Sequence, residues 1–193
     1  MQRIILASQS PRRKQLLDWA EVPFDIIIRE TDESYPPGLP VTDTAIHIAR
    51  NKALAVKASV ISGENGFPFN TPILAADTIV VLDKEIIGKP KDRQDAIDIL
   101  SRLAGKKHEV ITGVVILEGD KEIAFSDITE VEFHPLSLGQ ISFYVDKYKP
   151  YDKAGAYAIQ EWIGVVGIKQ VKGDFYNVMG LPVSRVVKEL KGL

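Results

Sequence analysis

The sequence Leu6-Ala7-Ser8-Gln9-Ser10-Pro11-Arg12-Arg13 joins two segments with different hydrophobic patterns near the start of the chain. The apolar run Ile4–Ala7 is typical of a buried strand, whereas Leu16 and Leu17 have the spacing of one helix face. Because proline suits the first helical position, we expect the helix to begin near Pro11. The junction therefore predicts a strand-to-helix turn, and a second strand pattern at 24–28 completes a β-α-β opening.

Two arginines occupy the first turn of this expected helix. The N-terminal end of a helix carries partial positive charge and unpaired N–H groups, which favour anions over cations. Arg12 and Arg13 are therefore favourable there only if a polyanion is bound, and tolerable if they are solvated. Ser8 and Ser10 have no obvious nearby base, so we assign no serine nucleophile. We interpret the turn as a phosphate-binding site.

The composition is that of an ordinary globular protein. A length of 193 residues and a hydrophobic fraction of 45% fit one domain, or two closely packed lobes, with a substantial core. The 24 Lys and Arg residues nearly balance the 26 Asp and Glu residues, which argues against broad binding to nucleic acid or to membranes.

The absence of cysteine excludes disulfides, cysteine nucleophiles and thiolate metal sites. No apolar run reaches the roughly 18 residues that span a bilayer. The first residues also lack the pattern of a signal peptide. We therefore expect a soluble protein in the cytoplasm.

The rest of the chain alternates between helix and strand patterns, which predicts an α/β fold. We expect helices near 42–59, 92–103, 137–147 and 182–190, and strands near 73–82, 85–87, 109–117, 121–133 and 165–171. Residues 148–160 are rich in small, aromatic and polar side chains and are typical of a binding loop, and 173–177 is predicted as a second loop.

Three charged residues do not fit simple packing. Asp77 interrupts the apolar run 73–82, so it is either paired internally or, as we favour, presented to a site where the strand breaks. Lys52 falls on the apolar face of its helix and either snorkels into water or is held inward by an anionic ligand. Glu33, beside Asp32, belongs to a solvated loop or supplies an oxygen ligand for a hard cation.

No motif for a metal-binding histidine site or a nucleotide P-loop is present. His47, His108 and His134 lack the spacing of metal ligands, so we expect them on the surface or satisfied in the core. Lys89 is followed by proline rather than by the serine or threonine of a P-loop. What recurs is a set of cations with two carboxylates, which suits phosphate oxygens and Mg²⁺ and indicates phosphoryl or nucleotidyl chemistry.

Residues 6–17 resemble the signature of the Maf family of nucleoside triphosphate pyrophosphatases. Later family motifs are matched in order by residues 49–53, 75–80, 88–90, 112–114, 152–160 and 177–182. The resemblance covers nearly the whole chain. It implies a single domain over 1–193, with a bent mixed sheet flanked by helices, two lobes with a central cleft, and often a homodimer.

The resemblance also implies an activity. The family cleaves nucleoside triphosphates between the α- and β-phosphates, giving the monophosphate and pyrophosphate, and needs a divalent cation such as Mg²⁺ or Mn²⁺. Residues 152–160 are similar to the branch that acts on dTTP and UTP, an assignment that depends mainly on Gln160. Two alternatives remain: the same hydrolysis of a modified purine triphosphate such as 7-methyl-GTP, and a nucleotide-sensing regulator of cell division.

Residue roles carry over by position in the matched motifs. The resemblance implies that Asp77 is the general base that activates water, and that Glu33 and Asp77 hold the metal. It assigns triphosphate binding to four positions: Ser8, Arg13, Lys52 and Lys89.

Three further positions match those that determine specificity in the family: Arg12, Thr78 and Gln160. The amide of Gln160 has both a donor and an acceptor, which suits a pyrimidine edge with a carbonyl beside an N–H.

Overall fold

The computed structural model describes residues 2–192, and strands alternate with helices along most of them. The strands are β1 (Ile4–Leu6), β2 (Phe24–Ile26), β3 (Ile73–Leu82), β4 (Glu85–Ile87), β5 (Lys107–Glu118), β6 (Lys121–Phe133) and β7 (Ile168–Lys172). The helices are α1 (Pro11–Trp19), α2 (Val41–Ile61), α3 (Arg93–Leu103), α4 (Leu138–Tyr148), α5 (Trp162–Gly167), α6 (Phe175–Met179) and α7 (Val183–Leu190), with a 3-10 turn at Ala154–Ala156.

A mixed seven-stranded sheet forms the framework, in the order β2-β1-β3-β5-β6-β7, with β4 paired to β3. Strand β1 is parallel to both β2 and β3, whereas β4 and β7 pair antiparallel with β3 and β6. The prediction of an α/β fold with a mixed sheet and flanking helices is therefore confirmed. Within residues 2–192, no helix combines the length and the apolar character needed to cross a membrane.

The chain forms two compact units, which are described separately. Unit 1 comprises Met1–Asp77, Thr112–Asp127 and Gly180–Leu193, and unit 2 comprises Thr78–Ile111 and Ile128–Met179. Strands β3, β5 and β6 each contribute residues to both units. The bend of the sheet, the central cleft and the single-domain organisation that the family resemblance implies stay predictions.

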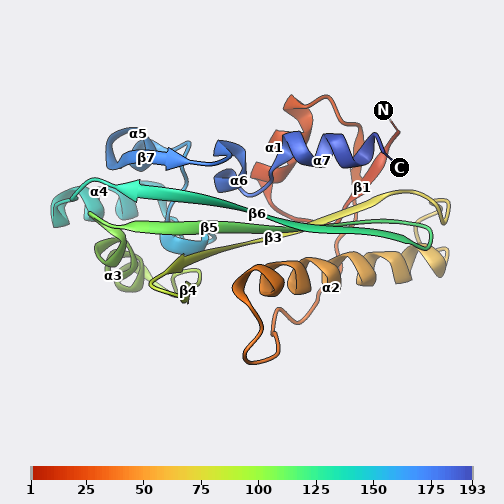
Figure 1. The fold of residues 1–193 in the computed structure, drawn as a ribbon, viewed down its shortest axis with the longest axis horizontal. Helices are drawn as coiled ribbons and strands as arrows, with labels where there is room; N and C mark the ends of the chain where they lie inside the picture. The colour runs from red at the N-terminus through yellow and green to blue at the C-terminus, as the bar shows by residue number, and fades with distance from the viewer. Residues whose placement is uncertain (1, 193) are drawn as a thin grey trace. The chain divides into compact units, whose positions relative to one another are not determined.

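In unit 1, helix α2 covers one face of the strands, and α1 and α7 lie on the other face (Figure 1). The apolar face of α2 packs on alternate residues of β1, β3 and β5 in a fully buried cluster that includes Ala53, Val56, Ile5 and Ile73. Helix and sheet approach closely at Gly113, where a Cβ atom would lie 2.3 Å from the backbone of α2. Glycine is therefore required in the Thr-Gly-Val motif for this packing.

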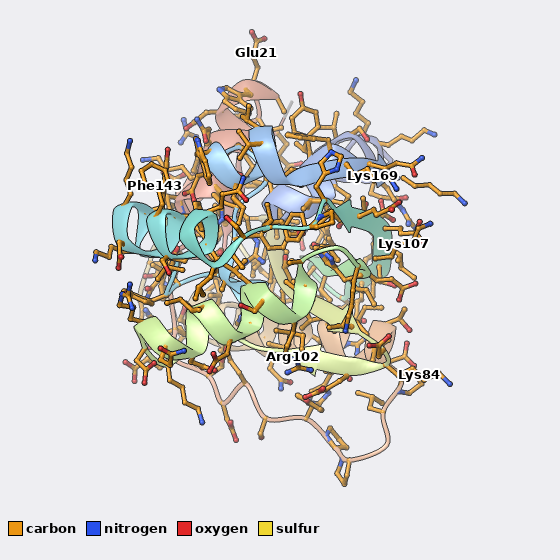
Figure 2. All side chains as sticks on the ribbon, turned by 90° about the vertical axis from the view of Figure 1, so that its left-hand side faces the viewer. Glu21, Lys84, Arg102, Lys107, Phe143 and Lys169 are labelled. Carbon is orange, nitrogen blue, oxygen red and sulfur yellow. The ribbon has the colours of Figure 1, made fainter. Side chains whose placement is uncertain are left out.

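In unit 2, helices α3 and α4 pack together, and each begins at a side-chain cap. Asp92 accepts a bond from the Asp95 N–H at 2.9 Å, and Ser137 forms a capping box with Gln140. Lys107 pairs across the sheet with Glu130, and Lys169 with Glu132, at 2.9 and 2.7 Å. Figure 2 shows the two lysines on the same side of this unit.

The predicted strand over 165–171 is wrong in its first part, because residues up to Gly167 belong to α5. The valine pair Val165-Val166 favoured a strand by intrinsic preference. Instead, the N–H groups of Gly164 and Val165 bond to the carbonyl of Glu161 at 2.9 and 3.3 Å and close helical turns. Strand pairing begins only with Ile168.

The predicted loop at 173–177 is also partly wrong, because α6 begins at Phe175. Asp174 accepts a bond from the Tyr176 N–H at 2.8 Å. The fully buried amide of Asn177 donates to the Val110 carbonyl and to Thr129 Oγ1, both at 3.0 Å. A helix of five residues is too short to show a helical period in the sequence.

Candidate active site

The turn between β1 and α1 has the predicted geometry, with Pro11 as the first residue of the helix. Ser10 caps α1 by accepting a bond from the Arg13 N–H at 3.4 Å. Ser8 Oγ accepts a bond from the Ser10 N–H at 3.2 Å, which fixes the residues before the helix. The stretch is therefore a structured strand-to-helix turn.

Arg13 is held inside unit 1 although it carries a charge. Its side chain is nearly buried, Nε donates to the Gly180 carbonyl at 2.8 Å, and Nη1 donates to Ser8 Oγ at 3.1 Å. Burial lowers the pKa of Arg13, and the nearby carboxylates of Asp77 and Glu33 oppose this shift. The guanidinium is therefore fixed in orientation and lies within the electrostatic range of both predicted metal ligands.

Lys52 of α2 joins the two predicted carboxylates. Its Nζ lies 2.7 Å from Asp77 Oδ1 and 2.7 Å from Glu33 Oε1. The side chains of Lys52 and Asp77 are only 18% and 15% exposed, whereas that of Glu33 is 54% exposed. Lys52 therefore points inward rather than snorkelling into water, and the anions in direct contact with it are the protein's own carboxylates. The anionic ligand stays a prediction.

The expectation that β3 breaks at Asp77 is wrong, because the strand runs without interruption from Ile73 to Leu82. The alternative of internal pairing is correct. The ammonium of Lys52 compensates the carboxylate, so the strand can continue through a charged residue at tolerable cost.

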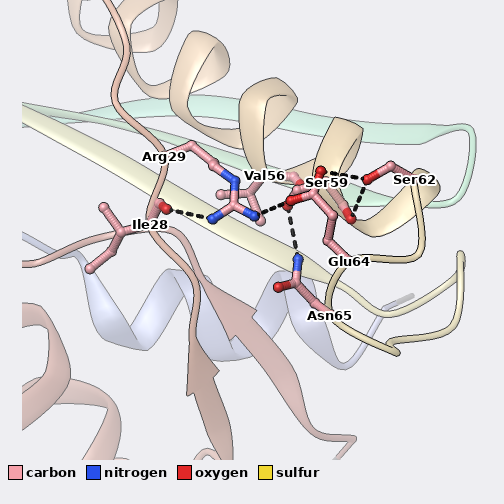
Figure 3. A network of polar contacts seen from close by, with 7 residues as sticks. All are labelled: Ile28, Arg29, Val56, Ser59, Ser62, Glu64 and Asn65. Carbon is pink, nitrogen blue, oxygen red and sulfur yellow. Dashed lines mark hydrogen bonds and ion pairs between the residues drawn. The ribbon is translucent and has the colours of Figure 1, made fainter.

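Glu33 lies in a loop whose start is tied to the C-terminal end of α2. Arg29 donates to Glu64 at 2.6 Å, within the network drawn in Figure 3. Beside Glu33, the carboxylate of Asp32 accepts bonds from the N–H of Ser34 at 2.9 Å and from its hydroxyl at 2.7 Å. The contact of Arg29 with Glu64 and the local bonds of Asp32 to Ser34 therefore shape the segment that brings Glu33 to Lys52.

The donor set fits a hard divalent cation that a phosphate ligand helps to hold. Glu33 and Asp77 already share one positive charge, the ammonium of Lys52, and they offer only oxygen atoms. In the described part of the chain, no group of three or more His, Cys, Asp or Glu residues could hold a metal ion. Two carboxylates with substrate phosphates are the arrangement that Mg²⁺ favours in proteins.

The other three predicted residues belong to unit 2. Thr78 follows Asp77 along β3 and is half-buried, whereas Lys89 and Gln160 are exposed. The Gly155 N–H donates to the Gly88 carbonyl at 3.1 Å, which joins the segments of Lys89 and Gln160. In unit 1, the structure brings Lys52 into direct contact with Asp77 and Glu33, and it joins Arg13 to Ser8. The meeting of these residues, and of Arg12, Thr78, Lys89 and Gln160, with one substrate stays a prediction.

The expectation for the histidines holds only in part, because the buried Nδ1 of His108 has no hydrogen-bond partner among the described residues. His108 is buried against Phe133 and Tyr157, and its Nε2 lies 2.7 Å from the Tyr157 hydroxyl. Burial lowers the pKa of His108 to about 4. His47 lies 3.2 Å from the amide of Asn51 on the same helix, and His134 is exposed.

Gly180 is the site residue that the sequence reasoning missed. Its carbonyl holds Arg13, and its φ of 115° is a backbone conformation that side-chain-bearing residues rarely adopt. The motif at 177–182 was recognised, but a backbone carbonyl leaves no mark of its own in a sequence. The unusual φ explains why glycine stands there.

Comparison with known proteins gives a consistent result. The family model described as "Maf-like protein" matches residues 3–193. A protein of Cytophaga hutchinsonii named "dTTP/UTP pyrophosphatase" is 51% identical over 97% of this chain and 83% of its own length. Proteins with the same name from Bacteroides thetaiotaomicron and Parabacteroides distasonis are each 44% identical, over 99% and 98% of this chain and 96% and 95% of their own lengths.

Proposed function

We propose a function from one established premise: the chain belongs to the family of Maf-like proteins. The protein is a nucleoside triphosphate pyrophosphatase that hydrolyses dTTP and UTP to the monophosphate and pyrophosphate. The names of the similar proteins support the substrates. The observation that carries the chemistry is the ion-paired set of Lys52, Asp77 and Glu33 next to the buried guanidinium of Arg13.

Asp77 is the general base in this proposal. A carboxylate has two oxygen atoms, so Asp77 can keep its ion pair with Lys52 through Oδ1 and accept the proton of the attacking water on the other. Its position within a continuous strand, together with the ion pair, fixes the direction of the carboxylate. A carboxylate held in a fixed direction is suited to accept a proton from a water molecule positioned beside it.

The cations of unit 1 stabilise the pyrophosphate as it leaves. Arg13 presents a fixed guanidinium, and the ammonium of Lys52 has three donors, so it can bind phosphate oxygens while it keeps its ion pair with Asp77. One such contact typically contributes about 3–4 kcal/mol to the transition state. Ser8 fixes Arg13 and lies beside the same phosphates, and Lys89 adds a further positive charge.

A divalent cation, Mg²⁺ or Mn²⁺, is part of the proposal and would be held by Glu33 and Asp77. When bound, it would neutralise charge on the phosphate oxygens. Base selection falls to Arg12, Thr78 and Gln160, the positions that determine specificity in the family. The cytoplasmic location and the homodimer that the family resemblance implies belong to the proposal as well, and light scattering of the purified protein measures the oligomeric state.

A panel of nucleotides tests the proposal directly. The purified protein is incubated with Mg²⁺ and with dTTP, UTP, dCTP, ATP, GTP or 7-methyl-GTP, and the products are separated. We expect monophosphate and pyrophosphate in equal amounts, mainly from dTTP and UTP. Equal rates with all six nucleotides would refute the specificity, and a preference for 7-methyl-GTP would favour the modified-purine alternative. Binding without any turnover would favour the nucleotide sensor.

A further inference from the structure

The segment that carries Gln160 ends in a tight turn over residues 158–161. The Glu161 N–H donates to the Ala158 carbonyl at 3.1 Å and closes this turn. Ile159 points inward and is buried, whereas Gln160, the third residue of the turn, is exposed. The position and direction from which the Gln160 side chain leaves the backbone therefore depend on how this four-residue turn is held.

A single buried hydroxyl bonds to both ends of the turn. Tyr144 of α4 is fully buried, and its Oη accepts a bond from the Ala158 N–H at 3.2 Å. The same hydroxyl donates to the carboxylate of Glu161. Burial and this carboxylate raise the pKa of Tyr144, so the hydroxyl keeps its proton and remains a donor.

A lysine holds the other side of the same carboxylate. Lys153 is nearly buried, and its Nζ lies 3.7 Å from Glu161 Oε1 and 2.8 Å from Asp152 Oδ1. Between Lys153 and the turn, Gly155 and Ala156 adopt φ values of 70° and 58°. A Cβ atom on Gly155 would lie 2.9 Å from Val80. The segment is therefore packed in one specific conformation.

Fixed orientation matters for a glutamine that reads a base. Thymine and uracil present a carbonyl beside an N–H, whereas cytosine presents an amino group beside an acceptor nitrogen. A side-chain amide can pair with either pattern if it is free to turn over, because its donor and acceptor simply exchange places. It discriminates between them only when its orientation is held, so that the wrong base leaves polar groups unpaired.

We propose that Tyr144 is a positioning residue for substrate selection: by bonding to both ends of the turn 158–161, it holds the backbone of Gln160, and so the position from which its amide meets the base, in the arrangement that accepts thymine and uracil and rejects cytosine. This inference rests on the proposed function and adds a specificity determinant that touches no substrate. Glu161 and Lys153 complete the support on the side away from Ala158.

The test is Tyr144→Phe, which removes only the hydroxyl. Initial rates with Mg²⁺ are measured for dTTP, UTP and dCTP. We expect kcat/KM for dTTP to fall about tenfold, mainly through KM, and kcat to change less than about twofold. The rate for dCTP stays the same or rises, so the ratio of dTTP to dCTP falls by about tenfold or more.

Tyr157→Phe is the matched control. It also removes a buried tyrosine hydroxyl from unit 2, and the hydrogen bond lost is the one to His108 rather than one to the turn. We expect it to lower stability and to leave the dTTP to dCTP ratio unchanged. An equal change of the ratio in both variants would overturn the proposal, because it would reduce the effect to general loosening of unit 2.

The outcomes separate this inference from the proposed function. If the wild-type protein shows no preference for dTTP over dCTP, the proposed specificity fails. If the wild-type preference is present and Tyr144→Phe keeps it, only the role of Tyr144 is refuted. Should Tyr144→Phe not fold, Glu161→Gln, which weakens the same anchor, must show the same loss of preference, and an unchanged ratio there refutes the proposal.

Discussion

Two largely enclosed lysines show how differently the two units use the same chemistry. The ammonium of Lys52 lies 2.7 Å from each of two carboxylates that come from a loop and a strand far apart in the sequence. Lys153, which is 10% exposed, pairs with Asp152 and Glu161 of its own segment. Lys52 joins three parts of the chain that are far apart in the sequence, whereas Lys153 pairs within one loop.

This difference bears on why each buried ion pair is present although burying its charges costs free energy. Removing charges from water costs several kcal/mol per ion, and apolar residues usually stabilise a core at least as well. A charged cluster built from distant segments, with Arg13 buried beside it, therefore supports the proposed charged ligand. Lys153 needs no ligand to explain it, because its loop has an unusual backbone that requires support.

The substitution Lys52→Met gives the strongest test of the difference between the two lysines. We expect kcat/KM for dTTP to fall about 10²–10³-fold, because the leaving pyrophosphate loses one cation and Asp77 loses its partner. Lys57→Met is the control on the same helix, where the ammonium donates to the Gly119 carbonyl at 2.7 Å. Loss of activity in the control to the same extent would show that damage to α2, and not the loss of a site residue, explains the result.

The complementary change, Lys153→Met, should act first on stability. We expect urea denaturation to show a loss of about 1–3 kcal/mol in unfolding free energy, because Glu161 keeps a charge without its cation. The fall in kcat should stay well below that of Lys52→Met. If both variants lose kcat equally, the division of roles between the two lysines is wrong.

Glu33→Gln separates metal binding from the ion pair. The amide keeps the size of the side chain and loses the charge, so the Mg²⁺ concentration for half-maximal activity should rise about tenfold or more, with kcat largely recovered at saturating Mg²⁺. Glu30→Gln removes a neighbouring exposed charge from the same loop and should have little effect. An unchanged Mg²⁺ requirement in Glu33→Gln would remove Glu33 from the metal site.

The pH dependence of stability tests whether His108 is buried in its neutral form in unit 2. Its folded pKa of about 4 lies below the ordinary value of 6.5, so below pH 6.5 the unfolded chain takes up a proton that the folded protein does not. This histidine therefore lowers stability by about 1 kcal/mol between pH 7.5 and 5.5. The contribution should vanish in His108→Gln and persist in His134→Gln, and urea denaturation at the two pH values measures it. An identical pH dependence in all three proteins would contradict the neutral, buried state.

Much of this fold can be predicted from local patterns. Pro11 and Ser10 mark the start of α1, Asp92 marks that of α3, and the apolar face of α2 is buried as expected. The two misses have different causes. At α5, local bonds to the Glu161 carbonyl override the strand preference of Val165 and Val166. At α6, buried Asn177 forms bonds that span more than 40 positions in the sequence, and no periodic pattern records such contacts.

The site was partly predictable for a similar reason. Lys52 and Asp77 were recognisable as unusual because each is a charged residue at a position where the pattern of its helix or strand predicts an apolar side chain. Whether they pair with each other could not be predicted, since the contact joins positions 52 and 77 across two elements. The ion pair with Lys52 allows the strand to continue through Asp77. Because this pair was not predicted, the predicted break of the strand at Asp77 was wrong.

The most direct test of the central claim is product analysis after dTTP is incubated with Mg²⁺ and either wild-type protein or Asp77→Asn. Asp25→Asn, which alters an exposed carboxylate paired with Arg3, is the control. We predict dTMP and pyrophosphate in equal amounts from wild type and control, and a rate about 10²–10⁴-fold lower from Asp77→Asn with nucleotide binding retained. Undiminished turnover by Asp77→Asn, or release of dTDP and phosphate by the wild type, would contradict the account.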